Sequence, residues 1–124
     1  MRQNISGGSP FEPIIGFSRA VRIGSAVHVS GTGPVGADDA DVTTQTSRVF
    51  EIIRAALAEA GAGLEHVVRT RMYLTHAADW EEVGRVHGRL FGEVRPAATM
   101  VVVAQLLNPA WRIEIEADAV LPQG

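Results

Sequence analysis

The fold is decided by Arg112-Ile113-Glu114-Ile115-Glu116-Ala117-Asp118-Ala119, a stretch in which polar and apolar residues alternate at a period of two. Such alternation predicts a β-strand that is buried on one face and exposed on the other. The acidic side chains of Glu114, Glu116 and Asp118 then share the exposed face. The preceding segment, residues 99–106, is apolar at nearly every position, so it predicts a strand that is buried on both faces.

Three further strands are predicted upstream of this pair. Two of them cover residues 17–23 and 26–29, and the small residues Gly24-Ser25 between them are suited to a tight turn. The third covers residues 67–74, where β-branched and aromatic residues are frequent. Together with the two C-terminal strands they predict a sheet of at least five strands.

A long helix is predicted between the second and third strands. Apolar residues recur there at helical spacing from residue 43 to residue 60. Asp41 or Thr43 is suited to cap its start, and Gly61 is suited to end it in the left-handed conformation.

A second helix is predicted to open at a capping box formed by Asp79 and Glu82 and to end near Gly92. Its spacing turns one face toward the core, and we expect that face to hold Trp80, Val83, His87 and Leu90 or Phe91.

The predicted order is β-β-α-β-α-β-β, an α+β arrangement with two helices on one face of a mixed sheet. Residues 1–124 are expected to form a single domain, with residues 1–13, rich in Gly, Ser and Pro, as an irregular N-terminal arm. Two helices cannot cover both faces of such a sheet, so the second face is either solvated or packed against another chain. We therefore expect an oligomer.

The composition excludes several function classes. The chain has no cysteine, and all eleven basic residues are arginine, so a thiolate nucleophile, a disulfide framework and a lysine Schiff base are ruled out. The net charge is −3 and the arginines are scattered, so nucleic acid is not an expected partner. No apolar run approaches the length of a membrane span, and the N-terminus does not resemble a secretory signal. We expect a cytoplasmic protein without membrane contact.

Four blocks of sequence carry a resemblance to a known family. They are Val29-Ser30-Gly31, residues 67–74, Arg95-Pro96-Ala97-Ala98-Thr99 and the alternating stretch at 112–119. In this order and spacing, the chain from about residue 15 to residue 120 resembles the Rid family, the YjgF-like reactive-intermediate deaminases. The resemblance implies a chorismate-mutase-like fold and a homotrimer with a central barrel. It also implies ligand clefts between subunits and hydrolysis of small imines or enamines without a cofactor or metal.

The same resemblance assigns candidate site residues. Glu114 matches the first glutamate of the family's Glu-Ile-Glu-Ala motif, which holds the water that attacks an imine carbon. Ser30 and Gly31 match the family's ligand-facing Val-Ser-Gly motif, and Thr99 matches a residue whose main-chain amide meets a substrate carboxylate. Phe17 is expected to close the apolar wall of the cleft.

Two positions depart from the pattern of deaminating members. Ala98 stands where those members carry a carboxylate-binding arginine, and Phe17 stands where they commonly have tyrosine. An arginine–carboxylate hydrogen bond contributes about 1.5–3 kcal/mol, so a 2-imino acid is expected to bind weakly here. Arg95 could reach over as a substitute, or it could be a solvated surface residue.

The expected reaction is therefore hydrolytic deamination of small imine or enamine metabolites. One alternative is a divergent hydrolase that acts on an enamine or amide without an α-carboxylate, and another is a non-catalytic ligand-binding module. The four histidines do not form a metal-binding pattern, and His87 is expected to be a hydrogen-bonded core residue.

Overall fold

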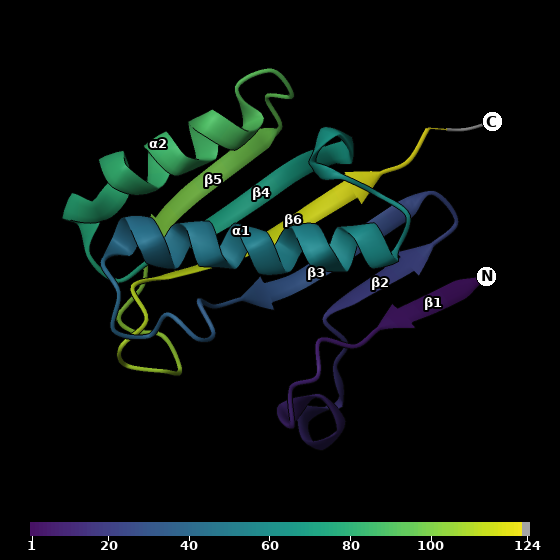
Figure 1. Cartoon of the computed structure of the whole chain (residues 1–124), viewed down its shortest axis with the longest axis horizontal. Helices are drawn as coiled ribbons and strands as arrows, with labels where there is room; N and C mark the ends of the chain where they lie inside the picture. The colour runs from purple at the N-terminus through teal and green to yellow at the C-terminus, as the bar shows by residue number, and fades with distance from the viewer. Residues whose placement is uncertain (123–124) are drawn as a thin grey trace.

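The structure, a computed structural model, describes residues 1–122. Two helices, α1 (Val42–Glu59) and α2 (Trp80–Phe91), pack on the same face of a six-stranded sheet (Figure 1). The strands follow one another across the sheet in the order β1-β2-β3-β6-β4-β5. Their bounds are Arg2–Ile5 for β1, Ala20–Ile23 for β2, Ala26–Thr32 for β3, Val67–Leu74 for β4, Ala97–Val102 for β5 and Ile113–Val120 for β6.

The sheet is mixed, as the sequence predicts. Strands β4 and β5 are parallel, while the other four neighbouring pairs are antiparallel. A parallel pair needs a crossover, which α2 supplies between β4 and β5. The predicted α+β class, with both helices on one face, is confirmed. No helix within residues 1–122 combines the length and hydropathy that crossing a bilayer requires.

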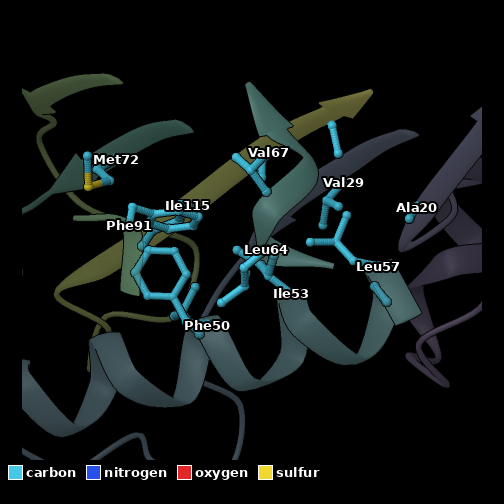
Figure 2. Packing of buried hydrophobic residues seen from close by; sticks show 14 of the residues in the cluster. Ala20, Val29, Phe50, Ile53, Leu57, Leu64, Val67, Met72, Phe91 and Ile115 are labelled. Atoms are coloured by element: carbon cyan, nitrogen blue, oxygen red, sulfur yellow. The ribbon is translucent and has the colours of Figure 1, made fainter. Parts of the chain in front are cut away.

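The core lies between the helices and one face of the sheet. Ile53 and Leu57 project from α1 toward the sheet, and Ile115 of β6 lies among the residues that meet them (Figure 2). All three are fully buried. Each such side chain stabilises the fold by roughly 1.5–3 kcal/mol. The apolar half of the β6 alternation thus fixes which face of the strand is left for polar side chains.

The first helix has the predicted ends. Asp41 is its N-cap, with a side-chain oxygen that accepts a hydrogen bond from the amide of Thr44 at 2.8 Å. Gly61 follows the helix with a φ of 83°, in the left-handed region that glycine adopts without strain.

The second helix starts differently from the prediction. Asp79 makes no capping hydrogen bond; its carboxylate instead accepts two hydrogen bonds from Arg112, at 2.9 and 2.7 Å. Trp80 is not on the inner face either, since 59% of it is exposed. The fully buried residues of this helix are Val83, Val86 and Phe91. Asp79 therefore ties the start of α2 to the start of β6, where a guanidinium is a stronger partner than a free amide.

The N-terminal segment and strand β5 also differ from expectation. The irregular arm predicted for residues 1–13 is wrong over β1, which pairs with β2 and buries Ile5. The strand predicted over residues 99–106 runs instead from Ala97 to Val102, because its partner β4 ends at Leu74 opposite Val102. In this edge strand Val102 is 55% exposed, so burial on both faces is not reached within one chain.

Candidate functional site

The Ser30–Gly31 segment forms a β-bulge at the end of β3. Val29 pairs with Ala117 and Thr32 pairs with Ile115, so three steps along β3 face two steps along β6. Bulges of this kind bend a strand and are frequent beside active sites. The Ser30 hydroxyl fixes the bend by donating to the main-chain oxygen of Ser18 at 2.6 Å.

Glu114 lies directly against this bulge. A Cβ atom added at Gly31 would collide with the Glu114 carboxylate, so the carboxylate occupies the space that a side chain at position 31 would take. Glu114 is half-buried, and burial raises its pKa, with Arg19 opposing the rise and Glu116 adding to it. Within residues 1–122 its carboxylate makes no hydrogen bond and no ion pair shorter than 4 Å. Its oxygens are therefore available to a ligand or water.

The other two acids of the row are occupied. Glu116 accepts a hydrogen bond from the Tyr73 hydroxyl at 2.6 Å, and this bond, with burial, raises the pKa of Tyr73. Asp118 pairs with Arg71 at 3.1 Å and with His28 at 2.8 Å. Arg71 of β4 thus pairs across the strands with Glu116 and Asp118, which gives these two acids a structural role.

A hollow of about 430 Å³ borders the bulge on the β2 side. Phe17 and Ser30 line it, together with Glu12 and Arg2. The Glu12 carboxylate accepts hydrogen bonds from the amides of Gly7 and Ser9 at 2.9 and 3.3 Å. Burial raises the pKa of Glu12, but these two amides, the Ser6 side chain and the charge of Arg19 together lower the pKa below its ordinary value. The hollow is therefore lined by both polar and aromatic side chains.

Ala98 and Thr99 lie elsewhere. Both are exposed on β5, at the sheet edge and two strands away from β6 (Figure 1). Ala98 is in register with the buried Thr70, and Thr99 with Arg71, so the two residues face opposite sides of the sheet. Within one chain the structure thus brings together Phe17, Ser30, Gly31 and Glu114 but not Ala98 or Thr99. These assignments stay predictions as binding residues.

Sequence reasoning missed Arg19, which contacts the bulge. Its Nη1 donates hydrogen bonds to the Gly31 carbonyl oxygen at 2.7 Å and to Thr32 Oγ1 at 2.8 Å. Its guanidinium carbon lies 5.4 Å from the centroid of the Phe17 ring, within cation–π range. The available signal was its position, since Arg19 precedes the buried Ala20 and must point to the opposite face of the sheet.

The remaining candidates play no part in this cluster. His87 Nε2 lies 2.8 Å from Thr70 Oγ1 and its ring packs against Phe91, as predicted for a core histidine. Burial lowers the pKa of His87. Arg95 is exposed after α2, with a φ of 56°. Across residues 1–122 no three His, Cys, Asp or Glu side chains gather as metal ligands would.

The protein matches a known family over almost its whole length. The family model described as endoribonuclease L-PSP matches residues 8–121. The chain belongs to the Rid family, also called YjgF. A solved structure of a YjgF/YER057c/UK114 family member from Mycobacterium tuberculosis has the same fold, with a TM-score of 0.92 and 47% identity. The match covers 98% of this chain and all of that one. The resemblance read from the sequence blocks is confirmed.

Relatives within the Rid family include one with a named activity. A protein named 3-aminoacrylate deaminase RutC, from Acinetobacter baylyi, is 32% identical over 117 residues, covering 90% of this chain and 91% of that protein. An uncharacterized protein from Streptomyces coelicolor is 38% identical over 121 residues, covering 94% and 90%. The comparisons therefore support a deaminase at the level of the Rid family.

Proposed function

We propose that this Rid-family protein is a hydrolytic deaminase of small imine or enamine metabolites. The observation that carries the proposal is the half-buried Glu114 carboxylate, which lies against the Gly31 bulge and has no paired partner among residues 1–122. Its two neighbours in the acidic row have partners. A base that must accept a proton from water needs this combination of free oxygens and a raised pKa.

The proposed reaction adds water to a C=N bond. Glu114 takes a proton from water while the water oxygen forms a bond to the imine carbon, and Glu114 then passes that proton to the nitrogen to give a carbinolamine. Glu114 next takes the proton of the carbinolamine hydroxyl and passes it to the nitrogen as the C–N bond breaks, so that ammonia leaves and the carbon keeps the oxygen as a carbonyl. Ser30 and Gly31 would orient the ligand through the main chain, and Phe17 would form the apolar wall. The proposal needs neither a cofactor nor a metal.

The proposal places this site in a cleft between the subunits of a homotrimer. The apolar side chains of Val101 and Val102 are exposed on the edge strand β5, and those of Phe11 and Ile14 are exposed in the segment that precedes Phe17. Exposed apolar patches are common at protein interfaces. Contact between the two patches of neighbouring copies would carry Ala98 and Thr99 toward the Glu114 cluster and turn the polar sheet faces toward a central barrel.

The test is the rate at which purified protein forms 2-oxo acid from freshly generated 2-iminobutanoate. The proposal expects acceleration over the buffer rate, and loss of that acceleration in Glu114→Ala. Absence of acceleration at micromolar protein would exclude this substrate class. Sedimentation of the same sample as a monomer would exclude the intersubunit cleft.

A second candidate function is hydrolysis of an enamine or amide that lacks an α-carboxylate. It is favoured by Ala98, which offers no charge at the position where deaminating members bind a carboxylate. A thermal-shift screen that includes neutral amides separates the two, because a ligand of the folded state raises the melting temperature. Binding without turnover of any hit would instead indicate a non-catalytic binding module.

Nucleic acid has no part in the proposal, although the family model bears the description of an endoribonuclease. The net charge of −3 disfavours a phosphate backbone. Several arginines are also engaged within the fold: Arg22 donates to the Ala60 carbonyl, Arg48 to the Val35 carbonyl and Arg112 to Asp79. A cytoplasmic location remains a prediction of the sequence.

A further inference from the structure

Arg19 connects three parts of the candidate site. Its main-chain oxygen accepts a hydrogen bond from the Ser30 amide at 2.9 Å. Its side chain donates to the Gly31 carbonyl oxygen at 2.7 Å and to Thr32 Oγ1 at 2.8 Å. A single residue thus holds the bulge through both its main chain and its side chain. The Phe17 ring covers the guanidinium at 5.4 Å.

A second feature of Arg19 is the position of its positive charge. The guanidinium is half-buried and interacts electrostatically with both Glu12 and Glu114. Yet within residues 1–122 no carboxylate oxygen lies within 4 Å of its nitrogens. Glu12 accepts hydrogen bonds from the Gly7 and Ser9 amides, whereas no donor among residues 1–122 bonds to Glu114. A direct ion pair with Arg19 would occupy the oxygens of the Glu114 carboxylate, and the observed arrangement leaves these two groups unpaired with each other.

We propose that Arg19 is the positioning residue of this site. It holds the Ser30–Gly31 bulge against Glu114 and sets a positive charge near that carboxylate without pairing with it. The inference rests on the proposed function only in taking Glu114 as the group that activates water. The expected role is to align Glu114 and the Gly31 main chain with the reacting carbon and to keep the carboxylate ionised while its oxygens stay free.

Arg19 is not expected to be a receptor for a substrate carboxylate. Two carboxylates already flank its charge, and a third anion beside Glu114 would be repelled. Loss of Arg19 should therefore lower kcat more than it raises KM. A receptor would show the reverse, with KM rising for carboxylate-bearing substrates alone.

The ionisation of Glu114 can be measured without any assay of activity. In protein labelled with ¹³C at glutamate carboxyl carbons, the resonance of Glu114 is assigned as the one missing from Glu114→Gln, and its midpoint is followed against pH. Within residues 1–122, the groups that interact electrostatically with Glu114 are Arg19, Glu116 and Tyr73. Behind them, Glu12 acts on Arg19, and Arg71 acts on Glu116 and Tyr73. The variants must therefore separate Arg19 from the others.

Three variants make that separation. Arg19→Gln keeps a donor for the Gly31 carbonyl but removes the charge, and Arg19→Lys keeps the charge but changes the donors. Arg71→Gln is the matched control, because Arg71 pairs with Glu116 and Asp118 instead. We expect the Glu114 midpoint to rise by about one pH unit in Arg19→Gln and to stay near the wild-type value in Arg19→Lys and Arg71→Gln. Thermal unfolding of each variant reports whether it is folded.

Kinetics on the imine substrate supply the second readout. We expect kcat to fall about tenfold in Arg19→Gln with KM within about threefold of wild type, and the acid limb of the pH profile to move upward with the NMR midpoint. An unchanged Glu114 midpoint in Arg19→Gln, or an equal rise in Arg19→Lys, would overturn the inference. So would a rise confined to KM. If the midpoint moves as expected in a protein without imine hydrolysis, the placement of charge by Arg19 stands and the proposed function fails.

Discussion

The acids at the two ends of the exposed face of β6 have different surroundings, and this difference separates a structural role from the proposed catalytic one. At the far end of β6, Asp118 is held by Arg71 and His28, and in the middle Glu116 is held by Tyr73. At the near end Glu114 faces a glycine bulge and has no paired partner among residues 1–122. The three acids occupy every second position of β6 and lie on the same face of the sheet, so residue type and alternation do not predict which of them is unpaired. The side chains that each acid meets on the neighbouring strands decide this.

Apart from substitution of Glu114 itself, the largest expected effect comes from closing the space between the bulge and the Glu114 carboxylate. Gly31→Ala places a methyl group against the Glu114 carboxylate, so we expect kcat/KM for imine hydrolysis to fall at least tenfold while the protein stays folded. Gly33→Ala is the matched control, because its methyl group would meet the Trp111 ring instead. Steady-state kinetics of the two variants check the contrast. Equal activity in Gly31→Ala and wild type would show that the close approach has no functional meaning.

The second prediction concerns the stability of the Gly33→Ala control. Trp111 packs against Gly33, and its Nε1 donates to Asp38 at 2.8 Å, so the ring has little freedom to move aside. Gly33→Ala should lower the free energy of unfolding by about 1–3 kcal/mol. Urea denaturation measures the loss. A variant as stable as wild type would mean that the Trp111 ring shifts without cost.

A smaller effect on stability is expected from neutralising Glu114. Burial raises the pKa of Glu114 in the folded state, so its contribution to stability is present at low pH and is lost as the pH rises through the folded-state pKa. Glu114→Gln does not titrate. It should therefore melt a few degrees above wild type at pH 7, and the gap should shrink as the pH falls below the usual range of glutamate. A gap that widens on acidification would contradict the raised pKa.

The smallest effect is expected at the paired acids. Tyr73→Phe removes the hydroxyl that donates to Glu116 at 2.6 Å, which should destabilise the protein by about 1 kcal/mol. Because Glu116 is assigned a structural role, kcat/KM should stay within about threefold of wild type. Thermal unfolding and kinetics on one preparation test both statements. A large loss of activity at unchanged stability would move Glu116 into the catalytic group.

Much of the fold could be predicted because local patterns and long-range packing agree. The alternation in β6 and the helical spacing over α1 both match the buried faces that the structure shows. β1 could not be predicted, because Arg2-Gln3-Asn4-Ile5 has little strand character and is ordered by pairing with β2. The role of Asp79 was equally hidden, since its partner Arg112 lies 33 residues away.

The candidate site could be predicted only in part. Motifs marked Ser30, Gly31 and Glu114, and the structure brings these three together. Arg19 lies outside those motifs, and its role depends on a bulge whose geometry no local pattern encodes. Ala98 and Thr99 were grouped with the site by resemblance, yet the register places them at the far edge of the sheet. In the proposed homotrimer, these two residues would reach the Glu114 cluster of a neighbouring copy.

The most direct test of the central claim is a side-by-side measurement of kcat/KM for imine hydrolysis by Glu114→Gln and Glu116→Gln. Both variants exchange a glutamate for its isosteric amide on the same face of the same strand. We predict that kcat/KM falls about 100-fold or more in Glu114→Gln and less than about threefold in Glu116→Gln. Equal losses in the two variants, or the larger loss at Glu116, would contradict it.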